Sequence, residues 1–271
     1  MNAATRRVRD AGRWLGGYLG LAIILGVILV LLGTGILPGR RWEPFGDIRV
    51  WQFLAQGLWV TVQIGATALV ISLVLAVPLA LGRIALPNPL RWIVVSWIEL
   101  VRATPVLALI LGITLFMPRG WLSPMGSATL ALTLYTSVVL AEILRAGILS
   151  IPKGEVDAAR SLGLSYPLTM RLVVVPQAFS RMMPALVSQM ITLIKDTSLA
   201  SIAAVSELAG YARSTHSFYG NPAETYFLVA CIYFVINYTL SRIARRLELQ
   251  RAKEPPVVIP GGLDQESGRT I

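Results

Sequence analysis

Ionisable side chains inside apolar segments are the residues of this sequence that could do chemistry. One group interrupts an apolar stretch and consists of Lys195, Asp196, Thr197 and Ser198. Isolated charges in such a place are costly and usually face the interior of a helix bundle or a cavity. On a continuous helix Lys195 and Asp196 would point about 100° apart, so we expect a local break there. Two interpretations stay open: a polar pathway or gate through the bundle, and a structural charge network.

The hydroxyls in this group and a second charged pair have simple structural explanations. Thr197 and Ser198 either offer hydrogen bonds to a ligand or bond back to their own helix. Glu142 and Arg145 lie three residues apart, on one face of a helix, which favours a structural ion pair.

Arg102 lies in another apolar run, close to Pro105. Proline leaves a backbone carbonyl one turn earlier without its usual donor, and Arg102 or Thr104 could donate to it. We therefore favour a structural role for Arg102 and Thr104, and keep a role in a pathway or gate as the alternative.

The sequence contains no plausible catalytic or metal-binding constellation. Its three lysines, Lys153, Lys195 and Lys253, do not form the Gly-x4-Gly-Lys-Ser/Thr phosphate loop, so the chain is not itself an ATPase. A single histidine, His216, and a single cysteine, Cys231, do not support a metal site or a disulfide framework. Gly-x-Ser-x-Gly and His-Glu-x-x-His motifs are also absent. We predict that the chain is not an enzyme and binds no metal or cofactor.

Composition indicates a membrane protein. The chain of 271 residues is 55% hydrophobic and 14% charged, with a mean hydropathy of +0.67, whereas soluble domains carry about a quarter charged residues. The net charge of +10 could suggest nucleic acid. However, the basic residues flank apolar runs and form no single patch, which favours a membrane protein that binds no nucleic acid.

Six apolar segments are long enough to cross a membrane core of about 30 Å, at about 1.5 Å per helical residue. They are residues 15–37, 54–81, 92–117, 125–149, 179–194 (with 199–205 after the expected break) and 226–243. The first has no convincing cleavage site and is interpreted as a retained extra helix. The predicted fold is therefore an all-α integral membrane protein with about six transmembrane helices. The Pro/Gly-rich tail, residues 248–271, is predicted to be disordered.

The distribution of positive charge predicts the orientation. Residues 1–14, the loop 83–91, the segment 150–178 with its edges Arg145 and Arg181, and the C-terminal residues from Arg242 onward hold 17 of the 24 Lys and Arg residues. The loops on the other side hold only Arg40, Arg41, Arg49, Arg119 and Arg213. Because cytoplasmic loops are enriched in Lys and Arg, both termini and the segment 150–178 are expected in the cytoplasm.

Residues 150–178 form the longest polar segment inside the apolar part of the chain. Pro152 and Gly154 would end the preceding helix. Glu155 and Asp157 would then lie in the first turn of a short new helix, where carboxylates complement the helix dipole.

The rest of this segment suits a docking surface. The small residues Ala158 and Ala159 would allow another protein to approach closely. Gly163 suits a left-handed helix end, and Ser165 with Pro167 suits a second helix start. The alternative is an ordinary polar loop without a partner.

The spacing of this segment resembles the EAA loop of the permease subunits of bacterial ATP-binding-cassette (ABC) importers, EAA-x3-G-x9-I-x-L-P. Residues 157–159 are Asp-Ala-Ala, Gly163 follows after three residues, and Val173-x-Val175-Pro176 follows after nine more. Glu, Ile and Leu of the family pattern are replaced conservatively by Asp157, Val173 and Val175.

Further stretches resemble the polar amino-acid branch of these importers. They are ELVRATP at 99–105, with Ala103 where glycine is usual, YTSVVLAEILRAG at 135–147, KDTSL at 195–199, VSEL at 205–208 and GLWVT at 57–61. The resemblance covers residues 54–247, which would form a five-helix permease core, and leaves out the helix 15–37.

The resemblance implies an inner-membrane permease that moves a polar amino acid. Its expected partners are a second permease subunit, identical or related, an ABC ATPase dimer that binds ATP and Mg, an extracytoplasmic amino-acid-binding protein, and membrane lipid. Residues 150–178 would be the cytoplasmic coupling loop, with coupling to the ATPase through Glu155, Asp157, Ala158, Ala159, Gly163 and Pro176. Two alternatives remain: an ion-coupled secondary transporter or channel without an ATPase, and a membrane enzyme or assembly factor.

Overall fold

The computed structural model describes residue 26 and residues 39–118 and 120–251, with side chains up to residue 243. Almost all of the predicted extra helix 15–37, the N-terminus 1–14 and most of the tail therefore lie outside the described residues. Every regular element within those ranges is helical. The chain divides into two compact units, Met1–Val60 with Ser206–Ile232 and Thr61–Val205 with Tyr233–Ile271.

The first unit contains a 3-10 helix, Gly39–Gly46, the start of α2 (Ile48–Ala85), α9 (Leu208–Tyr219) and the start of α10 (Pro222–Arg251). A Cβ on Gly57 of α2 would lie 2.8 Å from Cγ of Tyr211 in α9, so glycine allows these two helices to approach closely. The Glu207 carboxylate begins α9 by accepting hydrogen bonds from the backbone N–H groups of Ala209 and Gly210. At the start of α2, the backbone N–H of Arg49 lowers the pKa of the Asp47 carboxyl.

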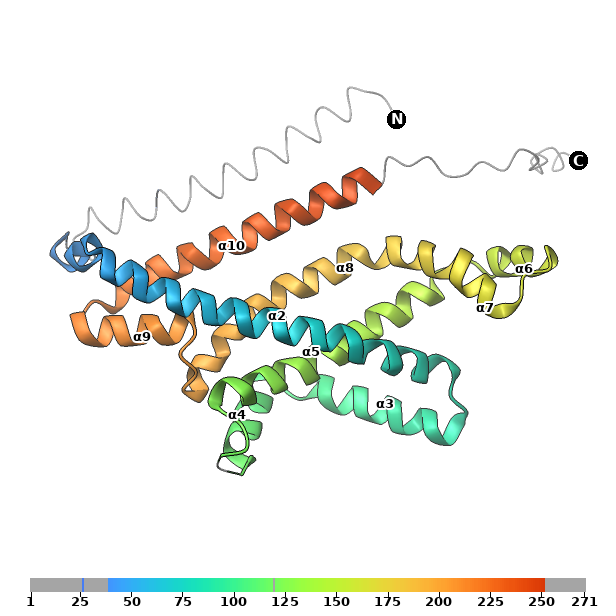
Figure 1. Cartoon of the computed structure of the whole chain (residues 1–271), viewed down its shortest axis with the longest axis horizontal. Helices are drawn as coiled ribbons and strands as arrows, with labels where there is room; N and C mark the ends of the chain where they lie inside the picture. Colours follow the sequence, from blue (N-terminus) through green and yellow to red (C-terminus); the bar gives the residue numbers. More distant parts are fainter. Residues whose placement is uncertain (1–25, 27–38, 119, 252–271) are drawn as a thin grey trace, which may run out of the picture. The chain divides into compact units, whose positions relative to one another are not determined.

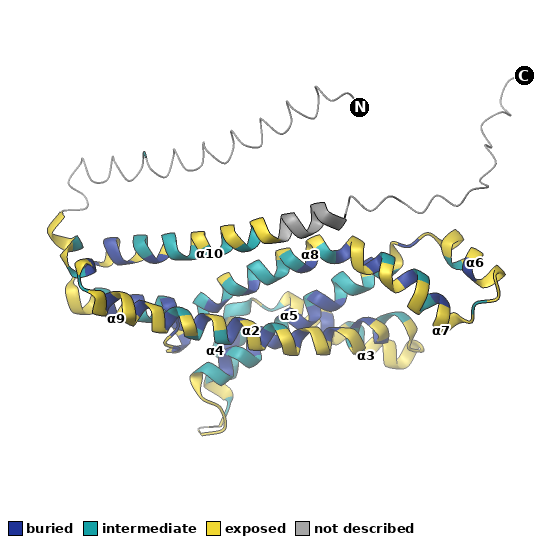
Figure 2. Cartoon of the chain, turned by 45° about the horizontal axis from the view of Figure 1, so that its top comes forward, coloured by how far each residue is buried: buried dark blue, intermediate teal, exposed yellow. Residues whose placement is uncertain are grey.

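The second unit is built around α5, which packs against α8, α4 and α3 (Figure 1). It contains the rest of α2 and α10, together with α3 (Asn88–Ala103), α4 (Val106–Phe116), α5 (Pro124–Leu149), α6 (Lys153–Ser161), α7 (Tyr166–Thr169), a π-helical turn η2 (Met170–Val174), α8 (Val175–Asp196) and a 3-10 helix η3 (Thr197–Ala203). Figure 2 shows buried residues along α5 and exposed ones on α3 and α6. The large exposed side chains of α2 and α3 are mostly apolar, as expected for a lipid-facing surface.

Three described helices are long and apolar enough to span a membrane: α2, α5 and the Pro222–Ile243 part of α10. The predicted span 92–117, in which an interruption at Arg102 and Pro105 is expected, consists of two helices, α3 and α4, which are bent by 100° and would count as a fourth span if taken together. The bend lies where Pro105 follows Thr104, because a residue before proline avoids the helical conformation.

Two further boundaries differ from the predictions. The predicted fifth span, 179–194, lies within α8, which is not among the helices that are apolar enough to span alone. The break expected within residues 195–198 is a change from α to 3-10 geometry at Thr197, because α8 still includes Lys195 and Asp196. Lys195 is exposed and Asp196 half-buried, so their different directions are accommodated without a break. At the other end, α10 reaches Arg251, beyond the predicted start of disorder at residue 248.

Candidate functional site

The segment 150–178 folds largely as its sequence predicts. α5 ends at Leu149, and α6 begins at Lys153 after Pro152. Gly163 follows α6 with φ of +83°, a conformation that other residues adopt only with strain. α7 then starts after Ser165. One detail is wrong: Glu155 is in the first turn of α6, whereas Asp157 is one residue beyond it.

The two alanines of α6 differ in exposure. Ala158 is exposed, whereas Ala159 is only 5% exposed. Only Ala158 therefore lies where another protein could approach closely, because a helix with 3.6 residues per turn points adjacent side chains about 100° apart. Val156, three residues before Ala159, packs against the core on the same inward face.

Polar contacts anchor α6 and its neighbouring turn to α8. Gln177 Nε2 donates a hydrogen bond of 3.2 Å to Glu155 Oε2, and Arg181 Nη1 donates one of 2.5 Å to the backbone carbonyl of Ser150. Apolar contacts add to them, since Val156 and Met170 pack against a cluster that includes buried residues of α2, α5 and α8. A movement of α6 would therefore act on the core directly.

The chain from α7 to α8 is helical throughout, and its middle part, η2, is a π-helical turn. The backbone N–H of Val175 donates to the carbonyl of Met170, five residues earlier. Such turns occur often at functional sites, and sequence reasoning did not identify this one. The exposed Pro176 lies at the first turn of α8, where a residue without an N–H is tolerated.

Exposed apolar side chains lie at the end of α6, in α7 and in η2, and sequence reasoning missed them. They are Leu162, Tyr166, Leu168 and Leu172. Together with Ala158 they form what we call the α6–α7 surface. The signal was in the sequence, because apolar residues recur within this otherwise polar segment, but only the structure shows which of them are exposed.

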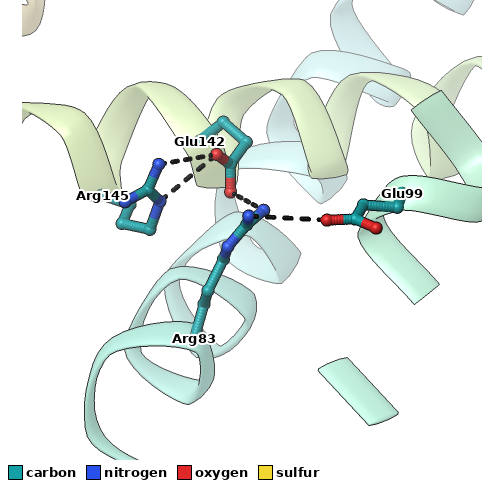
Figure 3. A network of polar contacts seen from close by, with 4 residues as sticks. All are labelled: Arg83, Glu99, Glu142 and Arg145. Atoms are coloured by element: carbon teal, nitrogen blue, oxygen red, sulfur yellow. Dashed lines mark hydrogen bonds and ion pairs between the residues drawn. The ribbon is translucent and has the colours of Figure 1, made fainter. Parts of the chain in front are cut away.

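A network of charges lies on α2, α3 and α5 (Figure 3). The predicted pair between Glu142 and Arg145 is confirmed, with 3.1 Å between Glu142 Oε2 and Arg145 Nη2. Arg83 adds a second contact, 2.6 Å from its Nη1 to Glu142 Oε1, and lies 3.8 Å from Glu99. Glu142 thus lies between two guanidinium groups, with its side chain 17% exposed.

The residues around Pro105 differ in their roles. The Thr104 hydroxyl donates to the Leu100 carbonyl at 2.9 Å, and the backbone N–H of Thr104 donates to the Val101 carbonyl at 3.2 Å. Thr104 therefore makes the kind of contact that its structural interpretation predicts. Arg102 is not needed for either carbonyl. It is exposed, and it lines the same cavity as Glu142.

The group at residues 195–198 lies elsewhere along α8. The Thr197 hydroxyl donates to the Ile194 carbonyl and the Ser198 hydroxyl to the Lys195 carbonyl, each at 2.7 Å, so both bond back to their helix. Lys195 is 14 residues after Arg181, or about 20 Å along the helix. The predicted pathway residues therefore form two separate groups, one with Arg102 and Glu142 and one at residues 195–198.

Comparison with known proteins identifies similar chains. Residues 68–252 match the family described as "Binding-protein-dependent transport system inner membrane component". The chain is 35% identical to the glutamate transport system permease protein GluD of Corynebacterium glutamicum, over 82% of this chain and 83% of that protein. It is 38% identical to the probable glutamine ABC transporter permease protein GlnP of Bacillus subtilis, over 73% of this chain and 94% of that protein.

A solved structure has the same fold. A crystal structure described as an amino acid ABC transporter with histidines superposes with a TM-score of 0.70 at 29% sequence identity. The match covers 75% of this chain and 96% of the other chain.

Proposed function

Because this chain belongs to the family of inner-membrane components of binding-protein-dependent transport systems, we propose that it is the permease subunit that moves a polar amino acid across the inner membrane. Several similar proteins carry names of permeases for glutamate or glutamine, which supports this substrate class. ATP hydrolysis takes place in a separate subunit, because this sequence has no phosphate loop.

The observation that carries the proposal is the α6–α7 surface. It presents an exposed small residue, Ala158, among exposed apolar side chains, while the opposite face of α6 is built into the core through Val156 and Ala159. A surface that only faced water would gain nothing from exposed leucines. A surface that receives an ATPase gains both contact area and a rigid connection to the transmembrane helices.

The mechanism follows from these connections. A partner ATPase dimer would hold ATP and Mg, and its closure would displace α6 and α7. The displacement passes through the Glu155–Gln177 contact and the continuous helical run into α8. It also reaches α5, where a Cβ on Gly147 would lie 3.1 Å from the Met182 sulfur, so that α5 and α8 move together. The bundle then releases substrate delivered by an extracytoplasmic binding protein.

The membrane orientation, the second subunit and the ATPase contacts are proposed from the sequence. Both termini and α6 lie in the cytoplasm, as the distribution of Lys and Arg predicts. A second permease subunit, a copy of this chain or a related one, completes the pathway. Glu155, Asp157, Ala158 and Gly163 contact the ATPase, whereas Ala159 positions α6 from its inner face.

Replacing Ala158 tests the proposal. We expect Ala158→Trp to leave the protein folded and to abolish co-purification of the ATPase, because the exposed indole would keep the partner away. Ala66→Trp, an equal change at an exposed position of α2, is the matched control and should keep the ATPase. Gly163 is a poorer choice, because its positive φ strains any larger residue.

The same experiment distinguishes the alternatives. If the wild-type chain transports alone and binds no ATPase, it is a secondary transporter and the proposal fails. If the ATPase binds equally well to the Ala158→Trp variant, docking occurs elsewhere.

A further inference from the structure

A cavity of about 550 Å³ lies between the end of α3, the second half of α5 and the first half of α8. This volume is within the range of pockets for small ligands. One part of its wall is apolar and includes Val139, Ile143 and Met182. Four charged side chains, Arg102, Glu142, Arg145 and Arg181, also line it, and every lining residue belongs to the same compact unit.

The charges of the cavity do not balance. Its wall contains three arginines, Arg102, Arg145 and Arg181, and one carboxylate, Glu142. That carboxylate is already shared by Arg145 and by Arg83, which lies outside the wall. Glu99, the other carboxylate of the network, is 3.8 Å from Arg83. Even with Arg83 and Glu99 included, four arginines face two glutamates.

Two of these arginines have donors to spare. Arg181 donates one hydrogen bond of 2.5 Å, from its Nη1 to the Ser150 carbonyl. Arg102, at the last turn of α3, makes no ion pair among the described residues. A guanidinium carries five N–H donors in a planar fork that fits the oxygens of a carboxylate or a phosphate. The two side chains come from different helices and line the same cavity.

We propose that this cavity binds an anionic oxygen group, either a phosphate or a carboxylate, between Arg102 and Arg181. Two sources supply that chemistry. The headgroup of an anionic phospholipid would place its phosphate at the arginines and its acyl chain along the apolar wall, as in other basic pockets between membrane helices. The side-chain carboxylate of a transported acidic amino acid is the second source, and this source alone rests on the proposed function.

The test compares two probes for each source. For lipid, the purified complex in detergent is offered equal amounts of phosphatidylglycerol and phosphatidylcholine, and native mass spectrometry measures which one stays bound. For amino acid, the complex in nanodiscs of phosphatidylcholine alone is titrated calorimetrically with L-glutamate and with L-glutamine.

The informative variant is the double substitution Arg102→Gln with Arg181→Gln, which leaves the Glu142 network intact. Its matched control is Arg91→Gln, an exposed arginine of α3 outside the cavity. We expect the double variant to bind the anionic probe at least about tenfold more weakly, from the loss of charge-assisted hydrogen bonds, and the control to bind within about twofold of wild type. Gel filtration verifies that each variant is folded and monodisperse.

Each outcome decides something. If the double variant loses binding of phosphatidylglycerol alone, the ligand is a lipid headgroup. If it loses binding of L-glutamate alone, the ligand is a substrate carboxylate. If wild type does not prefer the anionic probe in either arm, or if the double variant behaves like Arg91→Gln, the proposal is wrong. A chain that selects phosphatidylglycerol but binds no ATPase would contradict the proposed function and leave this site standing.

Discussion

Glu142 is the residue on which the charged end of the core depends. It accepts from Arg83 at 2.6 Å and from Arg145 at 3.1 Å, and its side chain is 17% exposed. The ion pair with Arg145 was predicted, because the two residues are three positions apart in the sequence. Arg83 was not, because it is 59 residues away and only the packing of α2 on α5 brings it near.

We expect Glu142→Gln to lower the free energy of unfolding by about 2–3 kcal/mol, since it leaves two guanidinium groups close together without a carboxylate. Glu99→Gln is the matched control. Glu99 is 65% exposed and 3.8 Å from Arg83, so its loss should cost less than about 1 kcal/mol. Denaturation of the purified protein in detergent measures both. If the two variants lose the same free energy of unfolding, the network does not stabilise the fold through Glu142.

At the scale of the element, α6 is a small amphipathic helix whose two faces have different tasks. The inner face, with Val156 and Ala159, contacts the core, and the outer face, with Asp157 and Ala158, is exposed. The helix has nine residues, and isolated helices of that length are marginal in water. Its stability must therefore come from the contacts of its inner face.

Leucine substitutions at the two alanines should separate these tasks. Ala159→Leu overpacks the inner face, and we expect it to cost about 1–3 kcal/mol locally. Hydrogen exchange of the backbone amides in α6 should then become about 5- to 100-fold faster. Ala158→Leu should leave this exchange unchanged, because its side chain is exposed. Faster exchange in both variants, or in neither, would contradict the assignment of faces.

At the scale of the whole molecule, the main expectation left to test is the side of the membrane on which each end lies. Lys and Arg counts place α6 in the cytoplasm and the loop that contains α9 outside. Exposed apolar residues are available in both regions, Leu162 after α6 and Phe218 in α9.

Cysteine labelling tests this orientation. In a Cys231→Ser background, a membrane-impermeant maleimide added to intact cells should label Phe218→Cys and not Leu162→Cys. Inverted vesicles should show the reverse pattern, because the opposite face then meets the reagent. Labelling of Leu162→Cys in intact cells would reverse the orientation and would exclude docking of a cytoplasmic ATPase on α6.

The sequence by itself determined the helical membrane class, the position of α6, the left-handed end at Gly163 and the family. These depend on composition, helix-breaking residues and local spacing, all of which act within a few residues. The sequence did not predict the 100° bend between α3 and α4 or the π turn before α8.

Only the tertiary structure decided which side chains meet. Arg83 joins Glu142, Ala159 turns inward while Ala158 stays exposed, and Arg102 and Arg181 line one cavity. The physical reason is that such contacts join segments far apart in sequence or depend on the rotation of a helix about its axis. Local propensity is nearly indifferent to that rotation, and the packing of neighbouring helices sets it.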